Sequence, residues 1–312
     1  MTVKLGYLLP TRERIMSGEP ATGPMLELAA RAEGLGFDGI WIGDSVTARP
    51  RHDPLTLMAA VAARVPRVSV GTAVLLPALR NPVVLAHQIA TIDQIAEGRV
   101  ILGVGIARDV PSIRAEFAAC GVPFERRVGR MLEGIRLMRA LWSGTPVDFS
   151  GEFFSLQGAT VGPTPYRANG PPFWIAGSLP QSLERAGRLL DGWMPNDGTP
   201  ADWAAKWAQV AAHARAAGRD PAGLTGSMYL TLSLDDDVAK AGERLDHYLQ
   251  QYYDTPAVAV RKRQTCFAGA PSAVAEYLSS FARAGAGHLI LRFVGDHRRQ
   301  MEHVARVRSE IA

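Results

Sequence analysis

The chain has 312 residues, of which 47% are hydrophobic and 21% are charged, and its formal net charge is +4. These values are typical of a soluble globular protein, and they exclude disordered and collagen-like chains. The two cysteines, Cys120 and Cys266, lie far apart and form no C-x-x-C pair. This excludes a disulfide framework and a cysteine-based zinc site, and it suits a reducing compartment.

The start of the chain predicts a strand rather than a targeting segment. The apolar run 3–9 ends at Pro10, is too short for a signal-peptide core and is followed by no cleavage site. Nowhere do about 18 consecutive apolar residues predict a membrane span. Basic residues alternate with acidic ones except at 261–263, so we expect neither a nucleic-acid nor a membrane partner. We therefore expect a cytoplasmic protein.

Short apolar runs alternate with longer amphipathic stretches along the whole chain. This alternation is typical of βα units around a parallel sheet. Asp53 and Asn81 each precede a proline at a predicted first helical position, where they are suitable N-caps. The predicted strands are 3–9, 38–43, 68–76, 100–105, 173–177, 192–194, 230–234 and 288–293. The predicted helices are 24–36, 53–64, 82–96, 124–142, 179–190, 201–217, 238–251, 272–284 and 298–311.

Eight such strands favour one fold class, a (β/α)8 TIM barrel, over a doubly wound sheet. The strands are nearly continuous apolar runs, as expected for strands that are covered on both faces. Segment 144–172 is rich in glycine and proline and too irregular for an ordinary loop. Because the alternation resumes after it, we interpret it as an excursion over one face of a single barrel domain, residues 1–312, rather than as a linker.

In a TIM barrel the active site lies at the carboxyl ends of the strands. The strand 38–43 is followed by a polar, arginine-rich loop that we predict to form the substrate side of the pocket. Its arginines would suit an acidic or carbonyl-bearing substrate, or the loop would fold over the cofactor. The predicted substrate-side residues are Asp44, Ser45, Arg49, Arg51 and His52.

Gly177 and Ser178 follow the fifth predicted strand and precede a helix with Pro180 in its first turn. A helix start offers free backbone N–H groups and the positive end of the helix dipole, so this is a candidate phosphate site. Alternatively, Ser178 is only an N-cap. If the phosphate site lies elsewhere, Arg292 at the end of the last strand is the next candidate.

The segment from Gly103 to Arg108 only partly matches a dinucleotide-binding fingerprint, because Arg108 stands where the third glycine is required. Either the glycines let the strand approach a cofactor, or they only let it approach its neighbour. No serine lies in a G-x-S-x-G elbow and no histidines are paired at metal-ligand spacing. We assign no catalytic residue and no metal ligand, and we expect a bound organic cofactor to supply the chemistry.

Several joined motifs resemble the luciferase-like flavin-dependent oxidoreductases. Residues 68–105 combine a strand, an R-N-P turn, a helix that ends before E-G-R, and a strand containing L-G-V-G. The similarity extends to GFDGIWIGDS, to FERRVGRMLEGIRLMRALWSG at 124–144, to FWIAGS and to DGWMPN. It therefore covers nearly the whole chain.

The resemblance implies a TIM-barrel enzyme that uses reduced FMN supplied by a partner flavin reductase, or else the deazaflavin coenzyme F420. By the matching motifs, Ala73, Val74, Gly105 and Ile106 would lie near the ring, and Gly177 and Ser178 would contact the phosphate. The resemblance also implies a homodimer. Leu79, Phe117 and the predicted helices 53–64 and 82–96 offer apolar surface for it.

One departure from the family matters. Several F420-dependent members carry histidine directly after the strand-two aspartate, whereas Ser45 follows Asp44 in this chain. This speaks against the sugar-phosphate dehydrogenase branch and leaves the cofactor open. Our main expectation is an FMN-dependent monooxygenase that oxygenates a small organic substrate. The alternatives are an F420-dependent reductase or dehydrogenase and a non-catalytic flavin-binding barrel.

Overall fold

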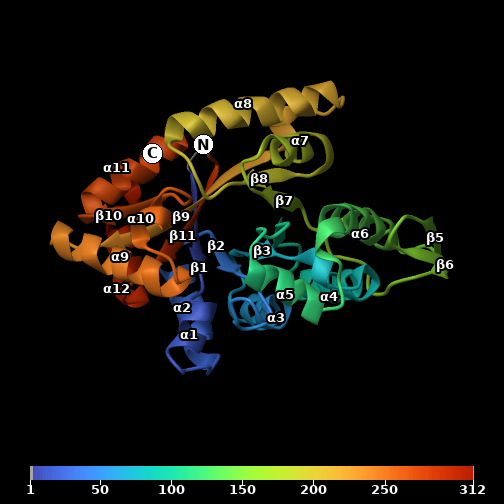
Figure 1. Ribbon diagram of the computed structural model, residues 1–312, viewed down its shortest axis with the longest axis horizontal. Helices are drawn as coiled ribbons and strands as arrows, with labels where there is room; N and C mark the ends of the chain where they lie inside the picture. Colours follow the sequence, from blue (N-terminus) through green and yellow to red (C-terminus); the bar gives the residue numbers. More distant parts are fainter. Residues whose placement is uncertain (1–2, 312) are drawn as a thin grey trace.

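The computed structural model describes residues 3–311 and contains a closed barrel of parallel strands surrounded by helices (Figure 1). Neighbouring barrel strands pair in chain order, and β9 pairs with both β8 and β11, which closes the circle. The predicted TIM barrel is confirmed. Its strands are β1 Lys4–Leu8, β2 Gly39–Ile42, β3 Ser69–Leu75, β4 Val100–Val104, β7 Phe173–Ala176, β8 Gly192–Met194, β9 Thr225–Leu234 and β11 His288–Phe293.

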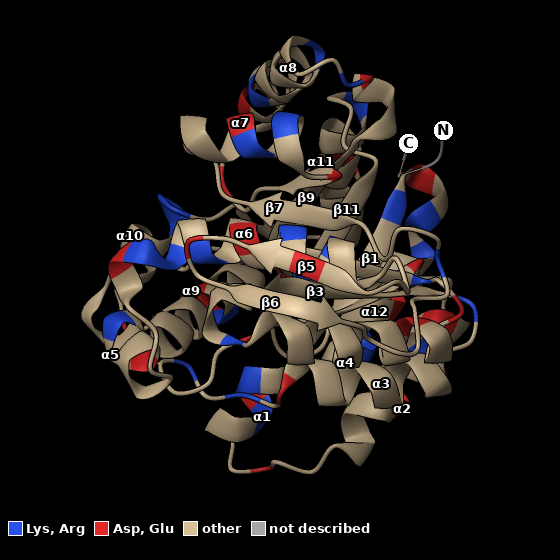
Figure 2. Ribbon diagram, turned by 90° about the vertical axis from the view of Figure 1, so that its right-hand side faces the viewer, with Lys and Arg blue, Asp and Glu red and all other residues tan. Residues whose placement is uncertain are grey.

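The predicted helices are present, with ends that differ from the prediction by a few residues. Asp53 and Asn81 cap their helices as predicted, since each side chain accepts a hydrogen bond from a backbone N–H of the first turn. The long helices are α2 Gly23–Gly34, α3 Pro54–Arg64, α4 Pro82–Ile95, α6 Arg127–Leu141, α7 Pro180–Leu189, α8 Pro200–Ala216, α9 Val238–Tyr253, α11 Pro271–Arg283 and α12 His297–Arg306. Charges of both signs are spread over the outer elements (Figure 2).

Four elements in the loops were not predicted, because each is short and lacks a repeating apolar pattern. The helices α1 Thr11–Met16, α5 Pro111–Ala119 and α10 Ala257–Arg261 follow β1, β4 and α9. The strand β10 Cys266–Gly269 pairs with the carboxyl half of β9, which is twice as long as predicted. These additions build up the carboxyl side of the barrel.

The excursion 144–172 is more ordered than predicted. It contains an antiparallel hairpin, β5 Val147–Ser150 and β6 Ser155–Ala159, which projects beyond α6 (Figure 1). The buried carboxylate of Glu133 on α6 accepts hydrogen bonds from the N–H groups of residues 152–154, each at 2.9 Å. A carboxylate that binds successive N–H groups therefore holds the turn against the barrel.

Large side chains fill the lower barrel interior, and small residues lie above them. The rings of Trp41 on β2 and Trp174 on β7 meet across the interior, with centroids 5.5 Å apart. A Cβ at Gly71 would lie 2.6 Å from the Trp41 ring, so glycine is required there. Because side chains alternate along a strand, the next inward positions are Gly43, Ala73, Gly105 and Ala176. These small residues leave the carboxyl end of the barrel open.

Phe117, which we expected to offer apolar surface for a dimer, does not lie on the surface. This ring is buried against Phe124, with centroids 5.2 Å apart, and cannot contact a second subunit. Leu79 is half-buried against the core. The exposed apolar side chains on α4 are Val84 and Ile95. Within residues 3–311, no helix has the length and apolar character needed to cross a membrane.

Candidate active site

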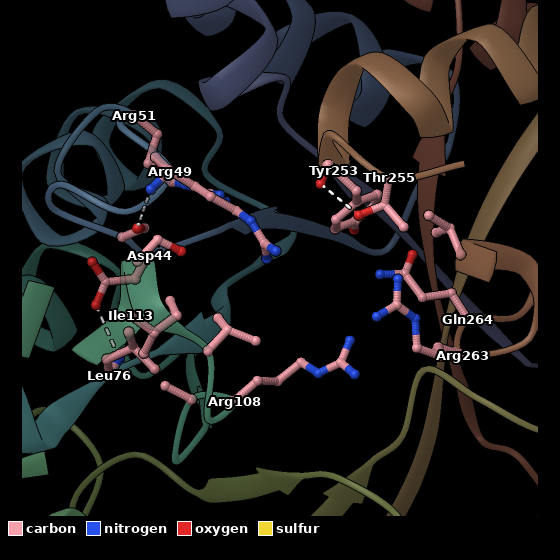
Figure 3. A pocket seen from close by; sticks show the side chains of 15 residues that line it. Asp44, Arg49, Arg51, Leu76, Arg108, Ile113, Tyr253, Thr255, Arg263 and Gln264 are labelled. Atoms are coloured by element: carbon pink, nitrogen blue, oxygen red, sulfur yellow. Dashed lines mark hydrogen bonds between the residues drawn. The ribbon is translucent and has the colours of Figure 1, made fainter. Parts of the chain in front are cut away.

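A cavity of about 330 Å³ opens at the carboxyl end of the barrel (Figure 3). Its walls are the loops after β2, β3 and β4 and the segment between α9 and β10. Arg108 and Arg263 extend into the hollow from opposite sides. Of the predicted substrate-side residues, Asp44, Ser45, Arg49 and Arg51 line this cavity.

His52 does not line the cavity, in contrast to the prediction. Its ring nitrogens lie 3.3 Å from the carbonyl oxygen of Thr11 and 2.7 Å from that of Pro20. Both carbonyls belong to the segment between β1 and α2, which includes α1. His52 therefore connects two loops instead of facing the substrate side.

The carboxylate of Asp44 is bound by protein donors. It accepts two hydrogen bonds from Arg80, at 2.5 and 3.0 Å, and one from the N–H of Leu76 at 2.9 Å. Its side chain is only 1% exposed. Asp44 thus joins the loops after β2 and β3, and its charge is neutralised before any ligand arrives.

Ser45 connects the arginine-rich loop to a residue that sequence analysis missed. Its hydroxyl donates to Glu116 Oε1 at 2.7 Å and accepts the N–H of Arg49 at 2.9 Å. The same Glu116 oxygen also accepts the N–H groups of Val46, Thr47 and Ala48. Glu116 is completely buried on α5 and has no motif around it. It holds the loop that carries Arg49 and Arg51.

Four arginines gather on one side of the barrel mouth, and we call them the arginine wall: Arg12, Arg49, Arg51 and Arg292. A Cβ on Gly43 would lie 2.5 Å from Arg51 Nη1, so this guanidinium lies against the carboxyl end of β2. Arg292 on β11 points into the same region, since its guanidinium contacts tyrosines from α9. The wall therefore combines residues from both ends of the chain.

Tyrosines, rather than carboxylates, surround the arginine wall. Arg292 donates to the hydroxyls of Tyr253 at 2.8 Å and Tyr252 at 3.3 Å. Arg49 lies over the Tyr253 ring at 5.0 Å, and Arg12 over the Tyr252 ring at 4.7 Å. These are cation–π contacts, which orient a guanidinium without neutralising it. Burial lowers the pKa of Arg12 and Arg49.

Tyr229 on β9 completes this side of the mouth. The Arg292 guanidinium lies 5.2 Å from the centre of its ring. Burial raises the pKa of the Tyr229 hydroxyl well above its ordinary value, so the group stays protonated. Sequence analysis missed Arg12, Tyr229, Tyr252 and Tyr253, because only the start of α1, the strand β9 and the end of α9 bring them to Arg292.

The predicted ring-side residues lie together at the ends of β3 and β4. Ala73 and Val74, joined by a cis peptide bond, are half-buried at the top of the barrel interior. A Cβ on Gly105 would lie 2.6 Å from Val74 Cγ2, and the Gly105 N–H donates to Leu75 O at 2.9 Å. Ile106 follows, half-exposed, with its carbonyl bound by Arg127 at 2.7 Å. This arrangement is a small apolar floor.

Ser178 is neither the N-cap nor a free donor. Helix α7 begins at Pro180 with Leu179 as its N-cap, and no side chain caps it. The Ser178 hydroxyl donates to Asp197, whose carboxylate lies 3.6 Å from Lys206 Nζ. Gly177 has φ +103°, a conformation that glycine adopts without strain. A phosphate here would therefore depend on backbone N–H groups rather than on the Ser178 proton.

The residues present fit a flavin or deazaflavin cofactor. Ala73, Val74 and Gly105 form a floor without charged groups, which suits a flat ring. Backbone N–H groups at the start of α7 suit an anion. On the arginine wall, the Tyr229 hydroxyl and Arg292 Nε are buried and have no hydrogen-bond partner within residues 3–311.

The sequence profile of the luciferase-like monooxygenases matches residues 3–308. The chain belongs to this family. It is 32% identical to the F420-dependent glucose-6-phosphate dehydrogenase of Rhodococcus erythropolis over 96% of this chain and 95% of that protein. It is 33% identical to the 5,10-methylenetetrahydromethanopterin reductase of Methanolobus tindarius over 70% of this chain and 64% of that protein.

Solved structures show the same fold. An F420-dependent secondary alcohol dehydrogenase, in complex with an F420-acetone adduct, superposes with a TM-score of 0.85 at 23% identity over the full length of both chains. A monooxygenase from Streptomyces bottropensis superposes with a TM-score of 0.81 at 25% identity, over 97% of this chain and 98% of that one. All the relatives named here are oxidoreductases, and the chain is an oxidoreductase of this family.

Proposed function

We propose that this protein is an F420-dependent oxidoreductase that exchanges two electrons with a small organic substrate without using oxygen. One observation carries the proposal: the relative that matches this chain over 96% of its length at 32% identity is F420-dependent. The 5,10-methylenetetrahydromethanopterin reductase from Methanolobus tindarius is not needed for this argument, since its match is shorter. The proposal replaces our main expectation with its alternative.

The FMN monooxygenase has weaker support. The monooxygenases appear among the structural neighbours at 25% identity or less, where similarity supports the fold more than the chemistry. A non-catalytic barrel has no named relative in its favour. We extend the cofactor of the Rhodococcus erythropolis enzyme to this chain but not its substrate, because Ser45 stands where several F420-dependent members have histidine.

The site residues take distinct roles in this proposal. Ala73, Val74, Gly105 and Ile106 would support the ring, and the backbone around Gly177 would bind the phosphate. Bound F420 supplies a two-electron carrier that gives a hydride to the substrate, or takes one from it, at ring atom C5. The mouth above the ring is walled by Arg49 and Arg51, which would orient the substrate and exclude water from one side.

The test is to titrate the purified chain with F420 and with FMN, and then to assay turnover without oxygen. We expect F420 to bind at least tenfold more tightly than FMN, and its absorbance to change when an oxidisable substrate is added anaerobically. Tighter binding of reduced FMN together with substrate-dependent oxygen consumption would favour the monooxygenase and contradict the proposal.

A further inference from the structure

The arginine wall has an unbalanced positive charge. Among residues 3–311, no carboxylate lies within 4.0 Å of the guanidinium groups of Arg12, Arg49, Arg51 or Arg292. Glu13 is the acidic group nearby, and it accepts a hydrogen bond from Tyr248. The Asp44 carboxylate at the same cavity is already bound by Arg80. Four positive charges therefore lie on one side of the mouth with little negative charge close to them.

Several other partly buried arginines of this protein have a structural partner. Arg80 forms a two-pronged pair with Asp44, and Arg244 pairs with Asp235 at 3.0 Å. Arg99 donates to three backbone carbonyls. The arginine wall instead meets tyrosine rings and hydroxyls, which carry no negative charge while protonated. Grouping unpaired cations away from water is costly, so a bound anion would stabilise this arrangement.

Unused donors point to the same conclusion. Arg292 is 6% exposed and Tyr229 is 8% exposed, yet Arg292 Nε and the Tyr229 hydroxyl have no partner within residues 3–311. Arg12 Nη1 is also buried without a partner. Buried polar groups are normally hydrogen-bonded. Three such groups lie on this wall, and a ligand with several acceptor oxygens would satisfy them.

The position in the barrel separates this wall from the predicted phosphate end of the cofactor. The wall comes from β11, from α1 directly after β1, and from the loop after β2. The strands β11, β1 and β2 are adjacent around the barrel. Gly177 follows β7, the fifth of the eight barrel strands, which lies opposite β1 in the circle. A cofactor lying over β3 and β4 with its phosphate at Gly177 would leave the arginine wall to the substrate.

We infer that the arginine wall is the recognition site for a substrate carrying at least two negative charges on carboxylate or phosphate groups. The inference deepens the proposed function and rests on it for the assignment to the substrate rather than to the cofactor. Guanidinium groups bind both kinds of oxyanion through paired N–H donors. Of the wall, Arg49 and Arg51 line the cavity, and Arg108 and Arg263 extend into it from opposite sides.

The test measures anion binding without turnover. The full chain is titrated calorimetrically with inorganic phosphate, with malonate and with uncharged glycerol, at fixed ionic strength. We expect phosphate or malonate to bind and glycerol not to bind. Arg49→Gln and Arg12→Gln should each weaken anion binding about tenfold, and the double variant further. Arg136→Gln, an equal charge change on an exposed part of α6, should leave it unchanged.

Two further measurements distinguish a substrate site from a cofactor site. The first is the affinity for F420 and for the deazaflavin core that lacks the phosphate and tail. The second is phosphate binding to the F420-loaded protein. If the wall binds substrate, Arg49→Gln changes neither affinity, and phosphate still binds to the F420-loaded protein. If Arg49→Gln weakens F420 but not the core, and F420 displaces phosphate, the wall belongs to the cofactor tail and the inference is overturned.

Failure of the inference is separable from failure of the proposed function. Anion binding by the free protein with no detectable F420 binding would overturn the proposed function and leave an oxyanion site. F420 binding with no anion binding, or with equal anion binding in wild type, Arg49→Gln and Arg136→Gln, would overturn the inference alone. In an active enzyme, Arg49→Gln should raise KM for anionic substrates at least tenfold with a smaller change in kcat.

Discussion

Glu116 shows how one buried carboxylate controls the loop that carries Arg49 and Arg51. A single oxygen of Glu116 accepts hydrogen bonds from Ser45 and from three successive backbone N–H groups. Ser45, which stands where several F420-dependent members of the family have histidine, serves this arrangement. The residue at this position therefore acts on the site through loop geometry, because its hydroxyl is bound within the protein.

We predict that Glu116→Ala lowers the free energy of unfolding by about 2–4 kcal/mol, because it leaves several donors unpaired. Ser45→Ala removes one hydrogen bond from the same carboxylate and should cost about 1 kcal/mol. Urea denaturation of both variants measures the difference. Equal losses in the two variants would show that the backbone N–H groups do not depend on Glu116.

The family resemblance implies that Ser178 contacts the cofactor phosphate, and the structure changes this expectation. Because its proton is donated to Asp197, Ser178→Ala should weaken binding of F420 by less than about threefold, below the value of a charge-assisted hydrogen bond. Gly177→Asp should weaken it at least a hundredfold, since it adds a negative charge at a φ of +103°. Titration with F420 and with the phosphate-free core measures both. A large loss of F420 affinity in Ser178→Ala would restore the hydroxyl as a phosphate ligand.

His288 lies inside the barrel between the rings of Trp41 and Trp174, at centroid distances of 5.3 and 5.5 Å. Burial, with a smaller contribution from Lys4, lowers the pKa of His288 to about 4. The folded protein thus keeps this ring neutral where the unfolded chain, with a pKa near 6.5, takes up a proton. Stability is therefore lost as the pH falls from about 6.5 to 4.

We predict that His288→Leu makes the free energy of unfolding less dependent on pH in this window. The slope should fall by up to about 1.4 kcal/mol per pH unit, the contribution of one proton. Urea denaturation at intervals between pH 4 and 7 measures it, and comparing slopes removes the effect of the substitution on packing. Parallel slopes for wild type and variant would contradict the depressed pKa.

At the scale of elements, Glu133 attaches the β5–β6 hairpin to α6. Glu133→Ala removes the acceptor for the N–H groups of residues 152–154. We predict that amide hydrogen exchange in this turn accelerates at least tenfold, while the barrel strands change little. Arg136→Ala is the control, because Arg136 is 71% exposed and lies 3.9 Å from the same carboxylate. Exchange mass spectrometry that finds the two variants alike would contradict the role of Glu133.

At the scale of the whole molecule, we predict a homodimer that uses the outer face of α4. Val84 and Ile95 on this helix are 55% and 41% exposed, and their burial would contribute to association. Light scattering should give twice the 33.6 kDa of one chain. Val84→Asp should shift the protein toward monomer, whereas Val238→Asp on α9 should not. A monomer at micromolar concentration in the wild type would contradict the prediction.

The sequence alone determined the barrel and most of its elements. Each barrel strand is an apolar run that must be covered on both faces, and each long helix carries a repeating apolar stripe. Such patterns are local, so they can be recognised without knowing which residues meet. The same is true of the caps Asp53 and Asn81, because a capping side chain bonds to its own helix. The short additions β10 and α5 were missed because they have too few residues to show a period.

Only the tertiary structure decided which side chains face the site. Sequence analysis placed Arg49 and Arg51 at the mouth, but it could not show that Arg292 joins them or that Tyr253 lies between. It also could not show that Asp44 is neutralised by Arg80, or that Glu116 holds Ser45. These contacts join residues from 36 to more than 200 positions apart, and they depend on loop conformation and side-chain rotamers. No periodic pattern in the sequence predicts these contacts, because the first and last strands come together only when the barrel closes.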